Sequence, residues 1–201
     1  MRKLSLVAVI LISLFILPLS SIAQNKYIGV KGCAMCHKTE KSGKQFDIWQ
    51  KTKHAEAYNT LSSPKALEIA KAKGIANPAE AKECLECHTL GKTVDASLFE
   101  KSFDIKSGVQ CETCHGPGSA YKNMTIMKDK AKALEAGITD FKDAATIEAF
   151  CKNCHNAQSP SYKEFKFAEM WDQIKHPMPK SQDCLLNNFF YEARLTVSLF
   201  L

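Results

Sequence analysis

The segment Cys33-Ala-Met-Cys36-His37 decides how this chain of 201 residues folds, because its spacing returns three more times. Two cysteines separated by two residues and followed by a histidine form the attachment signature of c-type haem. On one helical turn, each thiol can add to a haem vinyl group, and the histidine reaches the iron as proximal ligand. Each copy therefore predicts one covalently attached haem. The predicted attachment cysteines are Cys33, Cys36, Cys84, Cys87, Cys111, Cys114, Cys151 and Cys154, and the proximal histidines are His37, His88, His115 and His155.

Zinc binding and structural disulfides are the other common uses of a cysteine-rich pattern. A zinc site needs four ligands in total and gives no reason for a histidine after every second cysteine. Structural disulfides impose neither a two-residue spacing nor a trailing histidine. Because all four copies keep both features, the pattern favours four haem c groups.

The N-terminus has the layout of an export signal. Arg2 and Lys3 precede an apolar run over residues 4–17, and Ser21-Ile22-Ala23 suits a cleavage site. The apolar run is shorter than the ~20 residues that cross a bilayer, which favours cleavage over an uncleaved anchor. We therefore expect a mature protein without stable membrane insertion.

This organisation gives a signal peptide over residues 1–23 and a single haem-binding domain over residues 24–201. An apolar tail over residues 184–201, which includes Cys184, has no assigned role. Bacteria couple haem to this motif outside the cytoplasm. The periplasm is therefore the expected location.

The mature chain is short for the cofactors that it is predicted to hold. Four haems leave about 45 residues for each, close to the ~40 below which a chain rarely buries a sufficient core unaided. The porphyrins must then supply much of the core. We expect a mainly α fold, a single domain of short helices and loops wrapped around four covalently bound haems.

The net charge gives little indication of a nucleic-acid partner. The formal charge of the chain is +6, and the lysines are scattered without runs. Two propionates on each haem offset this charge. Some of the lysines are expected to steer redox partner proteins electrostatically.

Capping signals and apolar spacing predict several short helices. Ser63 and Pro64 mark the start of one helix and Gly74 its end. Apolar residues at near-helical spacing also predict that His54 lies on a helix. The predicted helices cover residues 46–58, 63–74, 77–84, 143–154 and 165–175.

The sixth iron ligands have few candidates. The chain contains six histidines, of which four are proximal, so only His54 and His176 remain for four distal positions. Methionine is the next available haem ligand, and Met124 and Met127 follow the third motif. Both are also ordinary packing residues. The inventory predicts that at least one iron lacks a strong second protein ligand.

Beyond the four motifs, the chain resembles the cytochrome c-554 family of tetrahaem cytochromes over most of residues 30–180. The members are known as electron acceptors from hydroxylamine oxidoreductase. The resemblance rests on Trp49 with Thr52 and His54-Ala55, on Gly108-Val109, Glu112 and Gly116-Pro117-Gly118 around the third motif, and on Phe165-Lys166-Phe167 with Glu169-Met170 before His176.

The resemblance implies a set of ligands. In the family, three haems have two histidine ligands, and the haem on the second motif is five-coordinate. Carried over, His54 lies opposite His115 on the third haem, and His176 lies opposite His155 on the fourth. The haem on His88 is then open, and the haems are expected to pack in stacked pairs.

One departure from the family concerns the first haem. The family's distal histidine for this haem lies about ten residues beyond the third motif, where this chain has no histidine between Ser119 and Met127. Either Met124 or Met127 replaces it, which would raise the potential of that haem, or the first haem is a second open site.

These observations predict a periplasmic electron carrier that relays single electrons between redox enzymes. A hydroxylamine oxidoreductase-like donor and a membrane quinol-linked cytochrome are the partner classes that the resemblance suggests. An enzyme is the alternative, with nitric oxide reduction or related chemistry at the haem on His88. Nothing in the sequence speaks directly for a haem sensor.

Overall fold

The computed structural model describes residues 24–90 and 94–178. The predicted signal peptide and apolar tail lie outside the described residues. Within the described ranges the protein has no β-strand, and a single isolated bridge joins Tyr27 to Phe99. The predicted mainly α fold is therefore confirmed. The α-helices are α2 (Val30–His37), α3 (Gln45–Gln50), α4 (Pro64–Ala72), α5 (Lys82–His88), α6 (Cys111–His115), α7 (Met124–Met127), α8 (Lys130–Glu135), α9 (Ala144–Cys151) and α10 (Phe167–Ile174).

Side-chain caps explain where several of these helices begin. The Ser63 hydroxyl accepts a hydrogen bond from the Ala66 N–H, and Pro64 occupies the first turn of α4. Asp143 caps α9 in the same way, because its carboxylate accepts the Thr146 N–H. These two predicted helices and α10 are confirmed, with ends within a few residues of those expected.

The predicted helix around His54 is wrong. The helix α3 ends at Gln50, and the chain then makes successive turns before a short 3₁₀ helix over Asn59–Ser62. The His54 carbonyl accepts hydrogen bonds from the Ala57 and Val109 N–H groups. A tertiary bond to Val109 thus takes the place of the bond that would continue an α-helix.

The predicted helix over residues 77–84 is also shorter than expected. The Asn77 side chain accepts the Ala79 N–H and holds a turn there. Only from Lys82 does the chain become helical. The helix α5 nevertheless covers the whole second motif.

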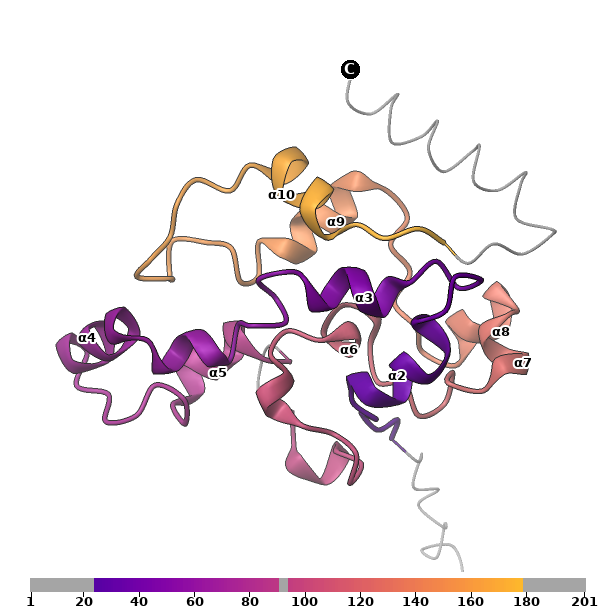
Figure 1. Cartoon of the computed structure of the whole chain (residues 1–201), viewed down its shortest axis with the longest axis horizontal. Coiled ribbons are helices and arrows are strands. Elements are labelled where there is room, and N and C mark those ends of the chain that lie inside the picture. The colour runs from indigo at the N-terminus through magenta and orange to yellow at the C-terminus, as the bar shows by residue number, and fades with distance from the viewer. Residues whose placement is uncertain (1–23, 91–93, 179–201) are drawn as a thin grey trace, which may run out of the picture.

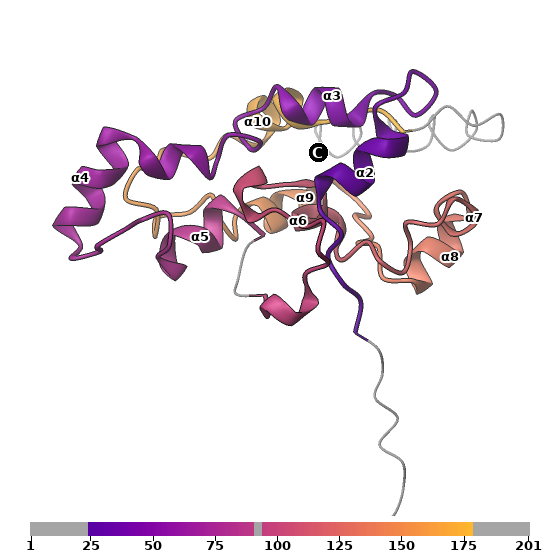
Figure 2. The ribbon, with the colours of Figure 1, turned by 60° about the horizontal axis from the view of Figure 1, so that its bottom comes forward.

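The helices lie on two sides of the molecule. Figure 2 shows α3 and α10 on one side and α5, α6 and α9 on the other. The helix α4 lies at one end of the long axis, and α7 packs on α8 at the opposite end (Figure 1). The first, second and third motifs lie within α2, α5 and α6, whereas α9 ends at the first cysteine of the fourth motif.

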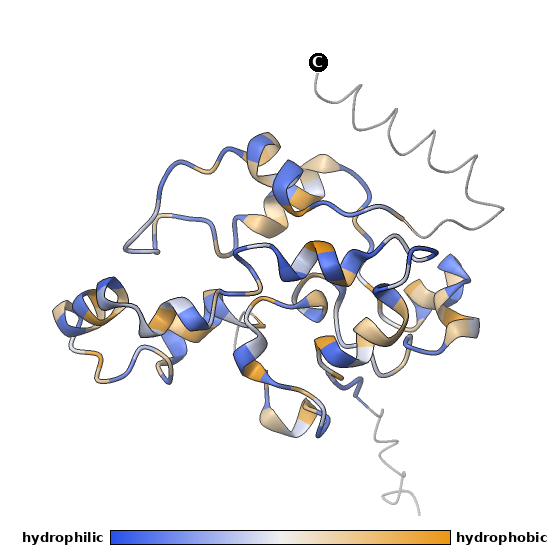
Figure 3. Ribbon diagram, in the orientation of Figure 1, coloured by the Kyte–Doolittle hydropathy of each residue, from blue (hydrophilic) through white to orange (hydrophobic). Residues whose placement is uncertain are grey.

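The polypeptide itself has a small apolar core. Figure 3 shows apolar and polar residues mixed along the helices. A domain of this length normally buries most of the surface of its unfolded chain, so the small core agrees with a fold that needs cofactors for its interior. The buried apolar residues of the described part are Ile28, Val30, Leu61, Ala70, Tyr121, Ala133 and Ile147.

Candidate haem-binding site

The four motifs come together in a fixed order. The thiol of Cys33 in the first motif lies close enough to that of Cys111 in the third for the two to affect each other's pKa. Cys114, at the other end of the third motif, interacts electrostatically with Cys151 of the fourth. Cys154 interacts in the same way with Cys87 of the second motif. The attachment cysteines therefore follow the spatial order first, third, fourth, second.

Two pairs of histidines face each other across the molecule. His54 faces His155, with ring centroids 6.0 Å apart, and His115 faces His176 at 5.9 Å. In each pair one histidine follows α3 or α10, and the other belongs to the third or fourth motif on the opposite side (Figure 2). Both predicted distal histidines thus lie next to a proximal one.

The pairing differs from the one that the family resemblance implied. His54 lies beside the fourth motif and His176 beside the third, which is the reverse of the expected assignment. Two hydrogen bonds to Val109, which precedes the third motif, fix the backbone around His54. The Trp49 indole N–H donates to the Val109 carbonyl at 2.8 Å, and the Val109 N–H donates to the His54 carbonyl at 2.9 Å.

The spacing of each pair fits one iron. A metal–imidazole bond is about 2 Å long, so two imidazoles on opposite faces of one metal have ring centres about 6 Å apart. The observed separations of 6.0 and 5.9 Å match this value. The ring planes are tilted by 53° and 42° rather than stacked. The residues present therefore fit haem with two histidine ligands at the third and fourth motifs.

The paired histidines are held in the neutral form that binds metal. Burial, helped by the neighbouring His176 and His37, lowers the pKa of His115 to about 4. Burial and the neighbouring His155 also lower the pKa of His54. The pKa values of His155 and His176 fall in the same direction, mainly through burial.

Phe165 orients one member of the pairs. Its ring stacks on the imidazole of His155 at 4.9 Å, with the planes 22° apart. Phe165 belongs to the Phe-Lys-Phe segment that precedes α10. This contact gives a structural role to one of the residues on which the family resemblance rests.

The proximal histidine of the second motif has a well-defined hydrogen bond. His88 Nδ1 lies 2.6 Å from the Ala57 carbonyl and 3.2 Å from Thr60 Oγ1. A carbonyl can only accept, so Nδ1 carries the proton and Nε2 is left free to bind iron. The segment that follows α3, through Ala57 and Thr60, therefore orients His88.

The proximal histidine of the first motif depends on Gln45. His37 Nδ1 lies 3.3 Å from Gln45 Oε1, and the Gln45 amide donates to the carbonyls of Ser42 and, at 3.0 Å, Pro177. Gln45 is buried. It thus joins the first motif to the residue that follows His176. Sequence analysis missed this residue, and a single glutamine at the start of a helix gives no local signal of such a role.

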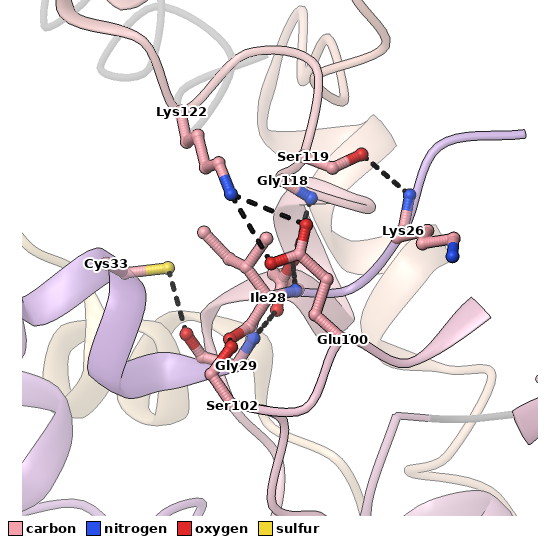
Figure 4. Close-up of polar contacts among 10 residues, drawn as sticks. Lys26, Ile28, Gly29, Cys33, Glu100, Ser102, Gly118, Ser119 and Lys122 are labelled. Atoms are coloured by element: carbon pink, nitrogen blue, oxygen red, sulfur yellow. Dashed lines mark hydrogen bonds and ion pairs between the residues drawn. The ribbon is translucent and has the colours of Figure 1, made fainter. Parts of the chain in front are cut away.

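Two buried polar residues beside Cys111 hold the N-terminal segment in place. The Glu112 carboxylate accepts the N–H groups of Ile28 and Gly29 at 2.9 and 2.7 Å, and that of Gly118 at 2.7 Å. Figure 4 shows the three donors converging there. Gln110 Oε1 accepts the Val30 N–H. The start of α2 is thereby fixed against the third motif.

Burial raises the pKa of the Glu112 carboxyl, although three backbone donors act in the opposite direction. Both carboxylate oxygens accept bonds, an arrangement that a side-chain amide cannot reproduce because its nitrogen donates. In the sequence, Glu112 is marked only by the family resemblance. The second and fourth motifs also have a charged residue between their cysteines, Glu86 and Lys152, and neither is buried.

Two comparisons with known proteins agree on the family. Residues 32–116 match the family model described as cytochrome c554 and c-prime. A relative called cytochrome c-554, from Nitrosomonas europaea, is 29% identical over 182 residues, which cover 76% of this chain and 75% of the relative. The chain is thus similar to the cytochrome c-554 family over these ranges. No solved structure matches the chain significantly.

This similarity indicates a c-type cytochrome of electron transfer, with covalently bound c-type haem as its cofactor. Bound haem supplies an iron that gains and loses one electron. The chain supplies the thiols, the neutral imidazoles and their orientation. In the part of the chain that the structure describes, no helix is long and apolar enough to cross a membrane.

The two candidate methionine ligands, Met124 and Met127, lie on α7. The side chain of Met124 is 60% exposed, and that of Met127 is half-buried. The helix α7 packs on α8. Ligation of the first iron by either residue stays a prediction.

Proposed function

We propose that this protein is a periplasmic tetrahaem electron carrier that passes single electrons between redox partner proteins. The four attachment motifs support four haems, and the layout of residues 1–23 supports export. The observation that contributes most is the spacing of the His54–His155 and His115–His176 pairs, 6.0 and 5.9 Å. Six-coordinate iron with two histidines has no free position for substrate and serves electron transfer.

The contacts between motifs support a definite path for the electrons. Cys33 adjoins Cys111, and Cys114 adjoins Cys151. Cys154 adjoins Cys87. We infer that electrons pass through the haems in the order first, third, fourth, second, with the haems on His37 and His88 at the two ends.

The end sites differ in ligation from the two in the middle. The third and fourth motifs use the two distal histidines, so neither His37 nor His88 retains a second histidine among the six of the chain. We propose that the iron on His88 is five-coordinate. For the iron on His37, Met124 and Met127 remain the proposed ligands, with an open position as the alternative.

A haem count and a redox titration test this proposal. Mass spectrometry of the exported protein should give the chain without residues 1–23 plus four haems. A titration with reductant should take up four electrons per protein. Electron paramagnetic resonance of the oxidised form should show two low-spin irons from the histidine pairs. Fewer than four haems, or four high-spin irons, would overturn the proposal.

The enzymatic alternative has less support. Neither comparison supports nitric oxide chemistry at His88, since both point to cytochromes. Adding nitric oxide to the reduced protein still has a use here. Formation of a nitrosyl complex at one or two haems would identify the open irons, which the distribution of histidines restricts to the end sites.

A further inference from the structure

The helix of the first motif has an unusual outer face. Lys31 and Met35 of α2 and Lys38, the residue that caps its C-terminus, are spaced by four and three residues, so they lie on one side of the helix. Cys33, Cys36 and His37 lie on the other side. The Met35 side chain is 74% exposed, and both lysines are exposed. Neither lysine has a hydrogen bond or ion-pair partner among the described residues.

The other three motifs have no such face. In the third motif, Glu112 is buried, and in the second, both residues between the cysteines are half-buried. In the fourth motif, Lys152 is exposed but pairs with Glu148 at 2.6 Å. Only the first motif presents an exposed apolar side chain between exposed, unpaired cations in the described part of the chain.

The charge around α2 is concentrated as well. Residues 24–44 contain five lysines and one glutamate, which gives +4 of the +6 of the whole chain. The one acidic residue, Glu40, pairs with Lys44. The region around the first haem is therefore strongly basic, although four haems bring eight propionates to the holoprotein.

We propose that the α2 face formed by Lys31, Met35 and Lys38 is the docking surface for an acidic electron-transfer protein. The face lies on the motif helix of an end haem, so a partner seated there is separated from the haem by about one helix diameter, ~10 Å. An exposed apolar side chain with a basic rim suits brief, electrostatically steered contacts. This inference rests on the proposed function and adds the place and charge of one partner.

The two other possible occupants fit less well. An anionic lipid surface needs a larger apolar area than one methionine provides. A second copy of the chain in a two-fold dimer would bring the same basic face against itself. An acidic protein meets neither difficulty.

Electron uptake from an acidic donor protein tests the surface. The probe is a reduced acidic flavodoxin, mixed with the oxidised holoprotein in a stopped-flow instrument at low ionic strength. In each transfer, one electron leaves the reduced flavin and reduces one ferric iron. The test variant is Lys31→Glu/Lys38→Glu. The control is Lys65→Glu/Lys71→Glu, which makes the same charge change on exposed lysines of α4, at the end of the molecule away from α2 (Figures 1 and 2).

The α2 variant should react about tenfold more slowly than the wild type, and the control less than twofold more slowly. High salt should remove most of the difference. Equal rates for both variants would overturn the proposal. The proposal would also be overturned if the α2 variant kept its rate with flavodoxin but lost binding to phosphatidylglycerol vesicles. Loss of self-association in sedimentation, again with an unchanged flavodoxin rate, would overturn it as well.

Two further measurements keep the result clear. In the neutral variant Lys31→Gln/Lys38→Gln, the rate of reduction by flavodoxin should also fall, but by less than in the glutamate variant. Unchanged haem absorption would confirm that the neutral variant is folded. Reduction by dithionite tests the proposed function separately. A protein that takes up four electrons from dithionite but shows no α2 effect remains a carrier without this docking surface, whereas one that fails with dithionite is no carrier.

Discussion

The two middle haem sites differ from the two end sites in how the chain orients their histidines. At the third and fourth motifs, His115 and His155 each face a second histidine from a distant segment, at 5.9 and 6.0 Å. At the first and second motifs, His37 and His88 instead have a hydrogen bond at Nδ1, to Gln45 and to the Ala57 carbonyl. A second histidine therefore faces each proximal histidine of the middle motifs, whereas a hydrogen bond at Nδ1 orients each proximal histidine of the end motifs.

This difference suits a carrier. Paired histidines leave the middle irons without a free position and favour similar potentials. In the proposed path, the end irons are the ones that exchange electrons with partner proteins. Their potentials depend on hydrogen bonds to one histidine, which single substitutions can change.

Removing a distal histidine should have the largest effect. His54→Ala takes one ligand from the iron on His155, so one low-spin ferric signal should be replaced by a high-spin signal. The potential of that haem should rise by about 0.1 V, a small part of the ~0.8 V range that axial ligands span. Electron paramagnetic resonance and a redox titration measure both. Lys53→Ala, at the exposed neighbouring residue, should change neither.

The same substitution also tests which histidines are paired. In a background without the fourth haem, made by Cys151→Ala/Cys154→Ala, His54→Ala should cause no further spectral change. In a background without the third haem, made by Cys111→Ala/Cys114→Ala, it should still produce a high-spin signal. The opposite pattern would show that His54 is the ligand opposite His115, as the family resemblance implied.

Gly108→Ala should disturb the fourth site through the backbone. Gly108 has φ of +72°, and a Cβ there would lie 2.5 Å from the His54 carbonyl oxygen. Its ψ is −145°, and a residue other than glycine in this conformation is strained by about 1–3 kcal/mol. The clash adds to this strain because backbone atoms cannot move aside cheaply. We expect a loss of about 2 kcal/mol or more in the free energy of unfolding, with partial high-spin character at the fourth haem.

Gly74→Ala is the matched control for this substitution. Gly74 has nearly the same φ, +70°, but nothing lies within 4 Å of a Cβ placed there. It should therefore lose only the ~1 kcal/mol of conformational strain and keep its spectrum. Equal losses in chemical denaturation, with no spectral change at Gly108→Ala, would show that the contact with His54 does not position it.

Local signals in the sequence were sufficient for the capped helices α4 and α9. Ser63 and Asp143 act within three residues of themselves, so their effect can be read from neighbouring letters. The histidine pairs could not be assigned in this way. Which proximal histidine His54 faces depends on packing between distant segments. The bonds of Trp49 and His54 to Val109, up to 60 residues away in sequence, likewise replace the helix that local spacing predicted.

Gln45→Leu should have a moderate effect at the first end site. The substitution removes the acceptor at His37 Nδ1 and the donor to the Pro177 carbonyl. A less basic imidazole stabilises the ferric iron less. The potential of the haem on His37 should therefore rise by about 0.05 V, equivalent to about 1 kcal/mol.

Gln50→Leu, at an exposed residue of the same helix, should leave all four potentials unchanged. The ligation of His176 gives a second readout for Gln45→Leu, because Gln45 binds the carbonyl of the next residue, Pro177. Slight broadening of the low-spin signal of the third haem would show that Gln45 also positions this ligand. A shift of the third haem alone would assign Gln45 to the middle sites and contradict the comparison.

Thr60→Val should have the smallest effect, at the other end site. Thr60 Oγ1 lies 3.2 Å from His88 Nδ1, but the Ala57 carbonyl is closer, at 2.6 Å. Since Nδ1 has one proton to donate, the carbonyl remains as its acceptor when the hydroxyl is lost. The potential of the haem on His88 should change by less than about 0.02 V, or ~0.5 kcal/mol. A shift as large as that of Gln45→Leu would make the hydroxyl the effective partner. The backbone would then no longer fix this end site, and His88 would depend on a replaceable side chain just as His37 does.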